Sequence, residues 1–410
     1  MTPRRLLAVM VLLILWATLT PDYSEPLQPW TLCLLCSRRG LADILCNIIL
    51  YGPLGACAAL AGWRGWRVML FAAVLSLGCE SAQMFIPGRD PSVTDLSSNV
   101  VGAGAGLVLA RTARWWLLPD PRRAGLLTLA GAVTAAGVFT LTGLLLVPSF
   151  PHSTYWVQWT PKLGHLEWYR GRVLQASLGG LDLPPDRPLP NSSEVRNLLL
   201  TGAPLRLTAV AGPPVPSLAS LFSIADEHPH EIFLVGPDRT DLVLRYRTRA
   251  AAVRLDQPDL RLADLARPLA AGDSFTLRVW RDGAGYCVQL NTAQACRNGF
   301  TIGDGWALLY YGSHWPAWYK ELLRVFWVAF LLLPLGLWGR RGWPSVVGGV
   351  SAAAGLVVIP ALVRLEPTTA SQLLGALAGV ALGVGLQAGL RARARGPLPA
   401  QPTPVAAPSS

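Results

Sequence analysis

The sequence predicts an α-helical polytopic membrane bundle of about eight spans, joined to an all-β jelly-roll sandwich outside the membrane. Hydrophobic residues form 52% of the 410-residue chain and charged residues only 14%, whereas soluble proteins carry about 25% charged residues. Long apolar segments lie toward both ends of the chain, and the middle alternates apolar and polar residues as strands do. This composition excludes a disordered chain and an ordinary soluble enzyme.

Eight apolar segments approach the roughly 20 residues that a membrane-spanning helix needs. They cover residues 6–19, 41–62, 68–85, 96–109, 124–147, 322–338, 346–363 and 370–390. The first follows Arg4 and Arg5 as in a signal peptide, but Ala17-Thr18-Leu19 is a poor cleavage site, so we favour a retained helix. We therefore divide the chain into 1–118 (spans 1–4), 119–147 (span 5), 148–319 (β-sandwich), 320–390 (spans 6–8) and 391–410 (disordered tail).

Arginine placement predicts the orientation, because basic residues concentrate in the cytoplasmic loops of membrane proteins. With the N-terminus inside, thirteen arginines lie in inner segments and four in short outer loops. The inner ones are Arg4, Arg5, Arg64, Arg67, Arg111, Arg114, Arg122, Arg123, Arg340, Arg341, Arg391, Arg393 and Arg395; the outer ones are Arg38, Arg39, Arg89 and Arg364. Lys320 and Arg324 oppose this trend without reversing it. We expect cytoplasmic termini and an extracytoplasmic 148–319, and the net charge of +11 then requires no nucleic-acid partner.

The segment 148–319 has the pattern of an antiparallel sandwich, with period-two alternation in short, regularly spaced runs. The runs are 172–178, 205–210, 231–235, 241–247, 274–281, 285–290 and 306–311. Gly236-Pro237-Asp238 and Asp282-Gly283 are turn signals, and 191–200 is a short helical stretch.

Residues 217–311 resemble the laminin-G/concanavalin-like jelly roll. The resemblance lies in residues 221–224, 241–245, 272–279 and 285–288, which are general strand patterns, and it implies a fold that often binds glycans. We find no acidic cluster for calcium and no E-x-D-x-x-E strand of the related glucanases. A spacer or a protein-contact domain is at least as good an interpretation as sugar binding, because fold alone does not determine function.

Seven cysteines divide into three groups. Cys46, Cys57 and Cys79 lie in apolar spans and suit buried thiols. We expect Cys287 and Cys296 to form a disulfide, because they lie outside the membrane on successive strands. Cys33-x-x-Cys36 also lies outside, as a disulfide or a thiol pair; alone it is a weak zinc signal. We expect no metal and no cofactor.

Polar residues gather at the outer ends of spans two to four. Spans two and four both begin with D-x-x-x-N, and the 52-residue offset between the two motifs suggests a parallel internal repeat. Span three ends with Glu80 and Gln83, and a tight loop carrying Arg89 follows. The predicted ligand site comprises Asp43, Asn47, Glu80, Gln83, Arg89, Asp95 and Asn99.

A structural role competes with this site. An Asp in the first turn of a helix can act as a cap, and buried Asn and Gln often join helices. Glu80 is harder to explain in this way, because an acid inside an apolar run is costly unless it is paired. Arg89 is the nearest basic residue in sequence, and that pair could itself be purely structural.

The order and spacing of these residues resemble the VanZ-like family over roughly residues 1–115. The match runs Glu80-x-x-Gln83-x-Phe85-x-Pro87-Gly88-Arg89, then Asp95-x-x-x-Asn99 and the 102–106 glycine run. Residues 41–43, Asn47 and 51–55 resemble its earlier helix, with Tyr51 where phenylalanine is more usual. The resemblance implies a bacterial inner-membrane protein and an association with teicoplanin resistance, without a settled mechanism.

Spans six to eight look like a degenerate copy of spans two to four. Gly375-Ala-Leu-Ala-Gly379 echoes the 102–106 run, and this alignment places Thr368 and Gln372 at the positions of Asp95 and Asn99. The copy lacks the acids, which indicates a structural role.

Three functions compete. The leading one is binding of an envelope glycan or lipid-linked precursor at the outer leaflet, with the lipid bilayer as the other partner. The second is a membrane enzyme that uses Glu80 or Asp95 as general acid or base, although all five histidines lie in 148–319. The third is a transporter, which predicts polar groups near mid-bilayer rather than at helix ends. The oligomeric state is left open.

Overall fold

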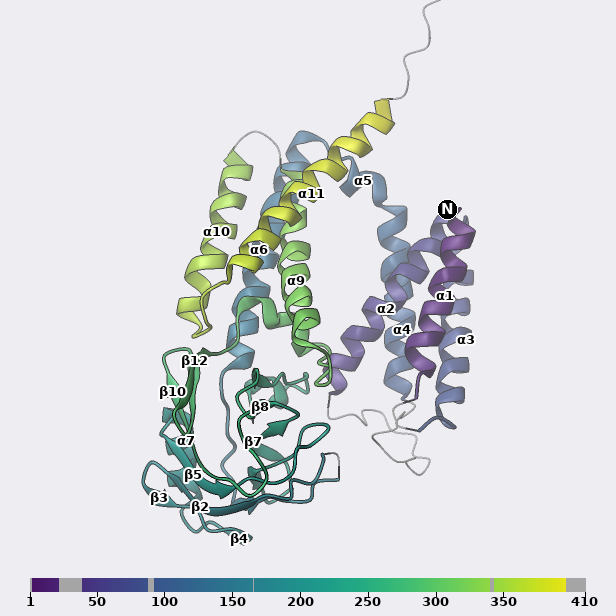
Figure 1. The fold of residues 1–410 in the computed structure, drawn as a ribbon. Helices are drawn as coiled ribbons and strands as arrows, with labels where there is room; N and C mark the ends of the chain where they lie inside the picture. The colour runs from purple at the N-terminus through teal and green to yellow at the C-terminus, as the bar shows by residue number, and fades with distance from the viewer. Residues whose placement is uncertain (1, 22–38, 88–91, 165, 340–342, 396–410) are drawn as a thin grey trace, which may run out of the picture.

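The chain folds into two helical bundles and one β-domain, as a computed structural model shows (Figure 1). The structure describes residues 2–21, 39–87, 92–164, 166–339 and 343–395. The first bundle precedes the β-domain in the chain, and the second is built from helices on both sides of it. The β-domain lies at one end of the second bundle (Figure 1).

The first bundle contains four helices: α1 (Pro3–Leu19), α2 (Gly40–Leu60), α3 (Gly65–Gln83) and α4 (Val93–Arg111). Buried Leu7 and Ile14 of α1 pack into this bundle. Ser92 caps α4, because its Oγ accepts a hydrogen bond from the Thr94 N–H at 3.1 Å. The short α5 (Ala113–Leu117) then leads toward the second bundle.

The second bundle contains α6 (Pro121–Leu146), α9 (Ala317–Trp338), α10 (Trp343–Leu362) and α11 (Ala370–Arg395). The second bundle is tied to α5 where Trp338 Nε1 of α9 donates to the Trp116 carbonyl at 2.7 Å. Our prediction of a tail from residue 391 was wrong at its start, because α11 continues to Arg395. The Ala/Arg composition of 391–395 favours helix, and 396–410 lie outside the described residues.

Among the described helices, six are long and apolar enough to cross a membrane: α2, α4, α6, α9, α10 and α11. Helix α1 has only 17 residues, and α3 carries Arg67, Glu80 and Gln83. The outward helix faces are nevertheless apolar, with Leu70 of α3 56% exposed and Val101 of α4 57% exposed. A soluble protein rarely leaves such faces uncovered, so the arrangement indicates a membrane protein.

The β-domain consists of two antiparallel sheets of six strands each. One has the order β4-β1-β6-β7-β8-β9 and the other β12-β11-β10-β5-β2-β3. The strands are β1 (Tyr155–Trp159), β2 (Arg172–Leu178), β3 (Leu181–Asp182), β4 (Arg187–Pro188), β5 (Leu205–Val210), β6 (Phe222–Asp226), β7 (Glu231–Asp238), β8 (Asp241–Tyr246), β9 (Leu260–Leu262), β10 (Ser274–Asp282), β11 (Gly285–Leu290) and β12 (Ala293–Asn298). Helices α7 (Ser192–Thr201) and α8 (Arg249–Ala252) and the 3-10 helix η1 (Ile302–Leu308) complete the domain.

The β-domain and the second bundle share one hydrophobic core. Inward side chains of both sheets, such as Ile224 and Leu207, join the same buried cluster as Phe139 of α6 and Val328 of α9. The first bundle has its own core around Tyr51 and Leu54, and of its described buried residues only Ala42, at the start of α2, joins the larger cluster. The second bundle and the β-domain therefore form one packed unit.

Six predicted strands are confirmed within a few residues, and β2, β5 and β11 have the predicted bounds. The strand predicted at 306–311 was wrong, since η1 covers most of it. Thr301 and Asp304 form a capping box that starts this 3-10 helix, and this local signal overrides the alternation.

The turn predicted at Gly236-Pro237-Asp238 was also wrong, because these residues lie inside β7. A Cβ at Gly236 would lie 1.8 Å from the Ala219 carbonyl oxygen, so the glycine permits a close backbone approach. The chain turns instead after Asp238, where Arg239 has a φ of 57°.

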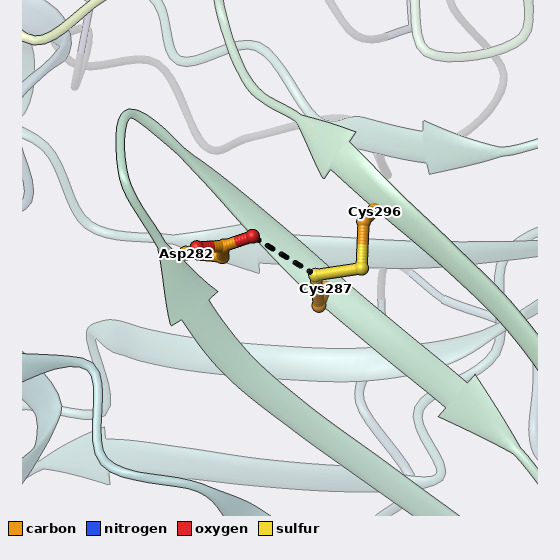
Figure 2. A group of neighbouring side chains, drawn as sticks. All are labelled: Asp282, Cys287 and Cys296. Atoms are coloured by element: carbon orange, nitrogen blue, oxygen red, sulfur yellow. Dashed lines mark hydrogen bonds between the residues drawn. A yellow bond between two sulfur atoms is a disulfide. The ribbon is translucent and has the colours of Figure 1, made fainter.

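The predicted disulfide between Cys287 and Cys296 is confirmed (Figure 2). It joins β11 to β12, at a shift of register between Tyr286 and Val288 that places Cys287 against Cys296. A covalent link of this loop length stabilises a fold by roughly 2–3 kcal/mol. It holds β12 at the edge of its sheet.

Glycines bring α2 and α4 into backbone contact. A Cβ at Gly106 would lie 1.8 Å from the Gly52 carbonyl oxygen, and one at Gly102 would lie 2.5 Å from that of Ile48. Both contacts advance in the same direction along the two helices, so the helices are parallel. Only glycine fits at such positions, as in other closely packed membrane helices.

Helices α9 and α11 repeat this contact. A Cβ at Gly375 would lie 2.8 Å from the Val325 carbonyl oxygen, and one at Gly379 would lie 2.1 Å from that of Ala329. The α4 and α11 glycines are 273 positions apart, and their α2 and α9 partners are 277 apart. The constant offsets support the internal copy suggested by the sequence.

Gly106→Ala should lower the free energy of unfolding by about 2 kcal/mol, the usual cost of an extra carbon in a filled space. Gly78→Ala is the matched control: it lies inside α3, and its added Cβ meets nothing within 4 Å. It should be neutral or slightly stabilising, because alanine favours helix. Thermal unfolding of the purified variants measures both, and equal behaviour would contradict the α2–α4 contact.

Candidate functional site

A group of polar side chains lies between α2, α3 and α4, near the ends where α2 and α4 begin. We call Asp43, Asn47, Ser76, Glu80, Asp95 and Asn99 the polar cluster. The group sits one to two helical turns from the glycine contacts, which hold α2 and α4 together. All six side chains are at least partly buried.

Glu80 ties the end of α3 to the start of α4. Its Oε2 accepts a hydrogen bond from the backbone N–H of Ser92 at 2.8 Å. Ser92-x-x-Asp95 has the spacing of a capping box, in which the third helical residue would accept that same N–H. Glu80 takes the place of Asp95 in this bond.

Asp95 faces α2. Asn47 contacts its carboxylate, and Asp43 and Glu80 lie within electrostatic range of it. Three carboxylates from three helices therefore lie close together, and among the described residues no salt bridge reaches any of them. Such a group suits a ligand that donates hydrogen bonds.

Asn99 lies deeper in the cluster, 3% exposed. Its Nδ2 donates to Ser76 Oγ at 2.9 Å, and within the described part of the chain its Oδ1 is buried without a partner. The hydroxyl of Tyr51 is also buried, beside Ser76 and Cys79, and it forms no well-aligned hydrogen bond with the residues that the structure describes. Buried polar atoms are normally satisfied in folded proteins, so these two atoms are candidates to bind a further polar group.

The sequence prediction missed Ser76 and Tyr51. Ser76 lies four residues before Glu80, and Tyr51 lies four residues after Asn47. Helical spacing of four places each on the face of its predicted neighbour. That periodicity was the available signal.

Gln83 makes a different contact. Its Nε2 donates to the Thr18 carbonyl at 2.9 Å and so joins α3 to the end of α1. Arg89, Cys33 and Cys36 lie outside the described residues.

The β-domain docks beside the cluster, on the first turn of α2. The N–H groups of Leu41 and Ala42 donate to the Arg254 carbonyl at 3.1 and 3.3 Å. Arg39 forms an ion pair with Asp256 at 3.1 Å, and Asp256 is itself mostly covered. Burial raises the pKa of Asp256 above its ordinary value, although Arg39 and two backbone N–H groups favour its ionised form.

The second bundle contains the counterpart of the cluster, with basic and neutral residues in place of the acids of α2 and α4. The helix offsets place Lys320 and Arg324 at the positions of Asp43 and Asn47, and Thr368 and Gln372 at those of Asp95 and Asn99. The acids of α2 and α4 thus have no acidic equivalents in α9 and α11.

Residues of the β-domain fill the counterpart position. Arg324 Nε lies 2.7 Å from Asp304 Oδ1, and Gln372 Nε2 donates to Thr301 Oγ1 at 2.8 Å. Lys320 Nζ donates to the Tyr311 hydroxyl at 2.9 Å. The segment around η1 therefore binds in the second bundle the side chains whose equivalents face one another in the first, although the buried Gln372 Oε1 has no partner among the described residues.

Among the described residues, Asp282, Cys287 and Cys296 form the one group of three potential metal ligands. Its Oδ2 lies 3.7 Å from Cys287 Sγ (Figure 2). Both sulfur atoms are bonded to each other in the disulfide. The oxidised pair offers no thiolate, the form that binds metal.

The family model described as VanZ/LLP1 matches residues 6–116. This interval contains most of α1, all of α2–α4 and the whole polar cluster, and it supports the resemblance seen in the motif. The β-domain and the second bundle lie outside the match. No curated protein is significantly similar to the chain. No solved structure is significantly similar to it either.

Arg324→Met should lower the free energy of unfolding by about 3 kcal/mol, because it leaves the buried Asp304 carboxylate without its cation. Arg123→Met is the matched control, since its ion pair with Asp120 is half exposed on both sides. Such a pair contributes less than about 1 kcal/mol. Thermal unfolding compares the two, and a smaller loss for Arg324→Met would contradict the role of the Asp304 pair.

Proposed function

We propose that this VanZ-like membrane protein of the bacterial envelope binds a lipid-linked or surface glycan or glycopeptide at the outer leaflet. The observation that carries the proposal is the convergence of Asp43, Glu80 and Asp95 between three helices. Glu80 accepts the N–H that an Asp95 cap would require, so Asp95 is turned toward α2.

The chemistry of the cluster suits the head group of such a ligand. Carboxylates accept hydrogen bonds, as does Asn99 Oδ1, which has no partner in the described part of the chain, and sugars and peptides supply hydroxyl and amine donors. The adjoining β-domain is large enough to contact the glycan part of the same ligand. Its predicted jelly-roll character would suit this role, and a link to teicoplanin-type resistance would follow if the ligand is the drug or its cell-wall target.

The proposal includes the orientation predicted from the arginines: eight spans in the inner membrane, cytoplasmic termini and an extracytoplasmic β-domain. Lys320 and Arg324 opposed this orientation in sequence. Their contacts with the β-domain, including the Asp304 carboxylate, remove much of the objection.

Two reporter enzymes can be inserted after Gly272, one that is active only outside the cytoplasm and one that is active only inside it. Only the first should be active at this position. Gly272 lies in an exposed turn before β10, so the insertion should not disturb the sheets. A reporter after residue 395 is the control and should give the cytoplasmic signal. A cytoplasmic signal from the Gly272 fusion would overturn the orientation.

Asp95→Asn should weaken binding of an undecaprenyl-linked disaccharide peptide or of teicoplanin by about tenfold, because it removes a charged hydrogen-bond acceptor. Asp182→Asn is the control, an exposed carboxylate on β3. Binding is measured with the detergent-purified chain. Unchanged affinity in Asp95→Asn, or no binding of either probe by the wild type, would contradict the proposal. Turnover of the bound compound, lost in Glu80→Gln, would instead support the enzyme alternative.

A further inference from the structure

A cavity of about 670 Å³ lies between the β-domain and the end of α10. Its lining includes Arg281 of β10 and Arg364, just after α10. Leu200 and Thr201 of α7 and Ala361 and Leu365 contribute further walls. The cavity is separate from the polar cluster, which lies in the first bundle.

The cavity sits where the membrane helices meet the β-domain. A Cβ at Gly143, near the end of α6, would lie 1.9 Å from Val363, so the ends of α6 and α10 are level. A Cβ at Gly285 would lie 2.4 Å from Glu366 Oε1, so the β10–β11 turn rests on the segment after α10. This is the level of lipid head groups in the proposed orientation.

The two arginines bring positive charge to this level from separate elements. In the part of the chain that the structure describes, neither guanidinium forms a salt bridge. Arg364 is also exposed and has a φ of 59°, a conformation that favours glycine. Most arginines of the chain lie in the predicted cytoplasmic segments, whereas Arg364 lies in a predicted outer segment. A local binding partner would explain its charge at this position.

The surface beside the cavity is apolar. Leu362 is 75% exposed and Val358 is 49% exposed, one turn apart on α10. A ligand at the arginines would therefore have apolar helix surface next to its charged end. Paired arginines suit phosphate, which they bind through several hydrogen bonds at once.

We propose that this cavity binds the phosphate of a membrane lipid, with Arg281 and Arg364 on the phosphate and the acyl chains along Val358 and Leu362 of α10. The bound lipid would seat the β-domain against the bilayer. This proposal uses the orientation in the proposed function but not the ligand of the polar cluster. Loss of one binding activity therefore leaves the other measurable in the same protein.

The test uses the full chain in detergent and native mass spectrometry with two lipids of matched acyl chains. Phosphatidylglycerol carries the phosphate, and a monoglucosyl diacylglycerol does not. The wild type should prefer phosphatidylglycerol by about tenfold, and the double variant Arg281→Gln/Arg364→Gln should lose that preference. The double Lys variant should keep part of it, because the charges remain.

Arg172→Gln is the matched control, an exposed arginine at the end of β2 that pairs with Val210 of β5. Val210 pairs with Ser274, at the opposite end of β10 from Arg281. This control should bind both lipids as the wild type does. Equal binding of the two lipids by the wild type, or a preference that survives in the double Gln variant, would overturn the proposal. Displacement of phosphatidylglycerol by equimolar inorganic phosphate would show a free-phosphate site instead and would overturn the lipid assignment.

Discussion

The backbone contact between parallel helices is the constraint on which the candidate site depends. Gly106 meets Gly52 at a distance that leaves no room for a side chain. This contact fixes the rotation of α2 and α4, and residues one or two turns away on the contact faces must then face each other. Asn47 and Asp95 come together for this reason. Without the glycines, the same D-x-x-x-N motifs would lie on helices too far apart to share a ligand.

The second bundle keeps the contact and changes the chemistry. Gly379 meets Ala329 as Gly106 meets Gly52, but Arg324 occupies the place of Asn47. An arginine among apolar helices requires a counter-charge, and Asp304 of the β-domain supplies it. The second bundle therefore anchors the β-domain through this position. The first bundle carries a group of acids and amides at the corresponding ends.

The sequence predicted much of the fold because its signals were local. Period-two alternation located β2 and β11, and apolar length located the helices near both ends. The errors arose where another local signal or a distant contact decided the outcome. The Thr301–Asp304 capping box replaced a strand with η1, and Gly236 serves a close approach to Ala219 rather than a turn. The approach to Ala219 joins segments that no pattern along the chain connects.

The polar cluster was predictable as a set of neighbours but not in its bonding. Helical spacing placed the acids and amides at the same ends of α2, α3 and α4, while it could not show that Gln83 would turn to α1. Nor could it show which group would accept the Ser92 N–H. That bond separates a cap from a shared site: because Glu80 holds Ser92, the start of α4 is satisfied without Asp95. The Asp95 carboxylate is then available to the space between the helices, where the unpartnered Asn99 Oδ1 also lies in the described structure. The start of α4 needs one acid to accept the Ser92 N–H, and two acids lie near it. Because Glu80 fills that role, Asp95 can serve another function.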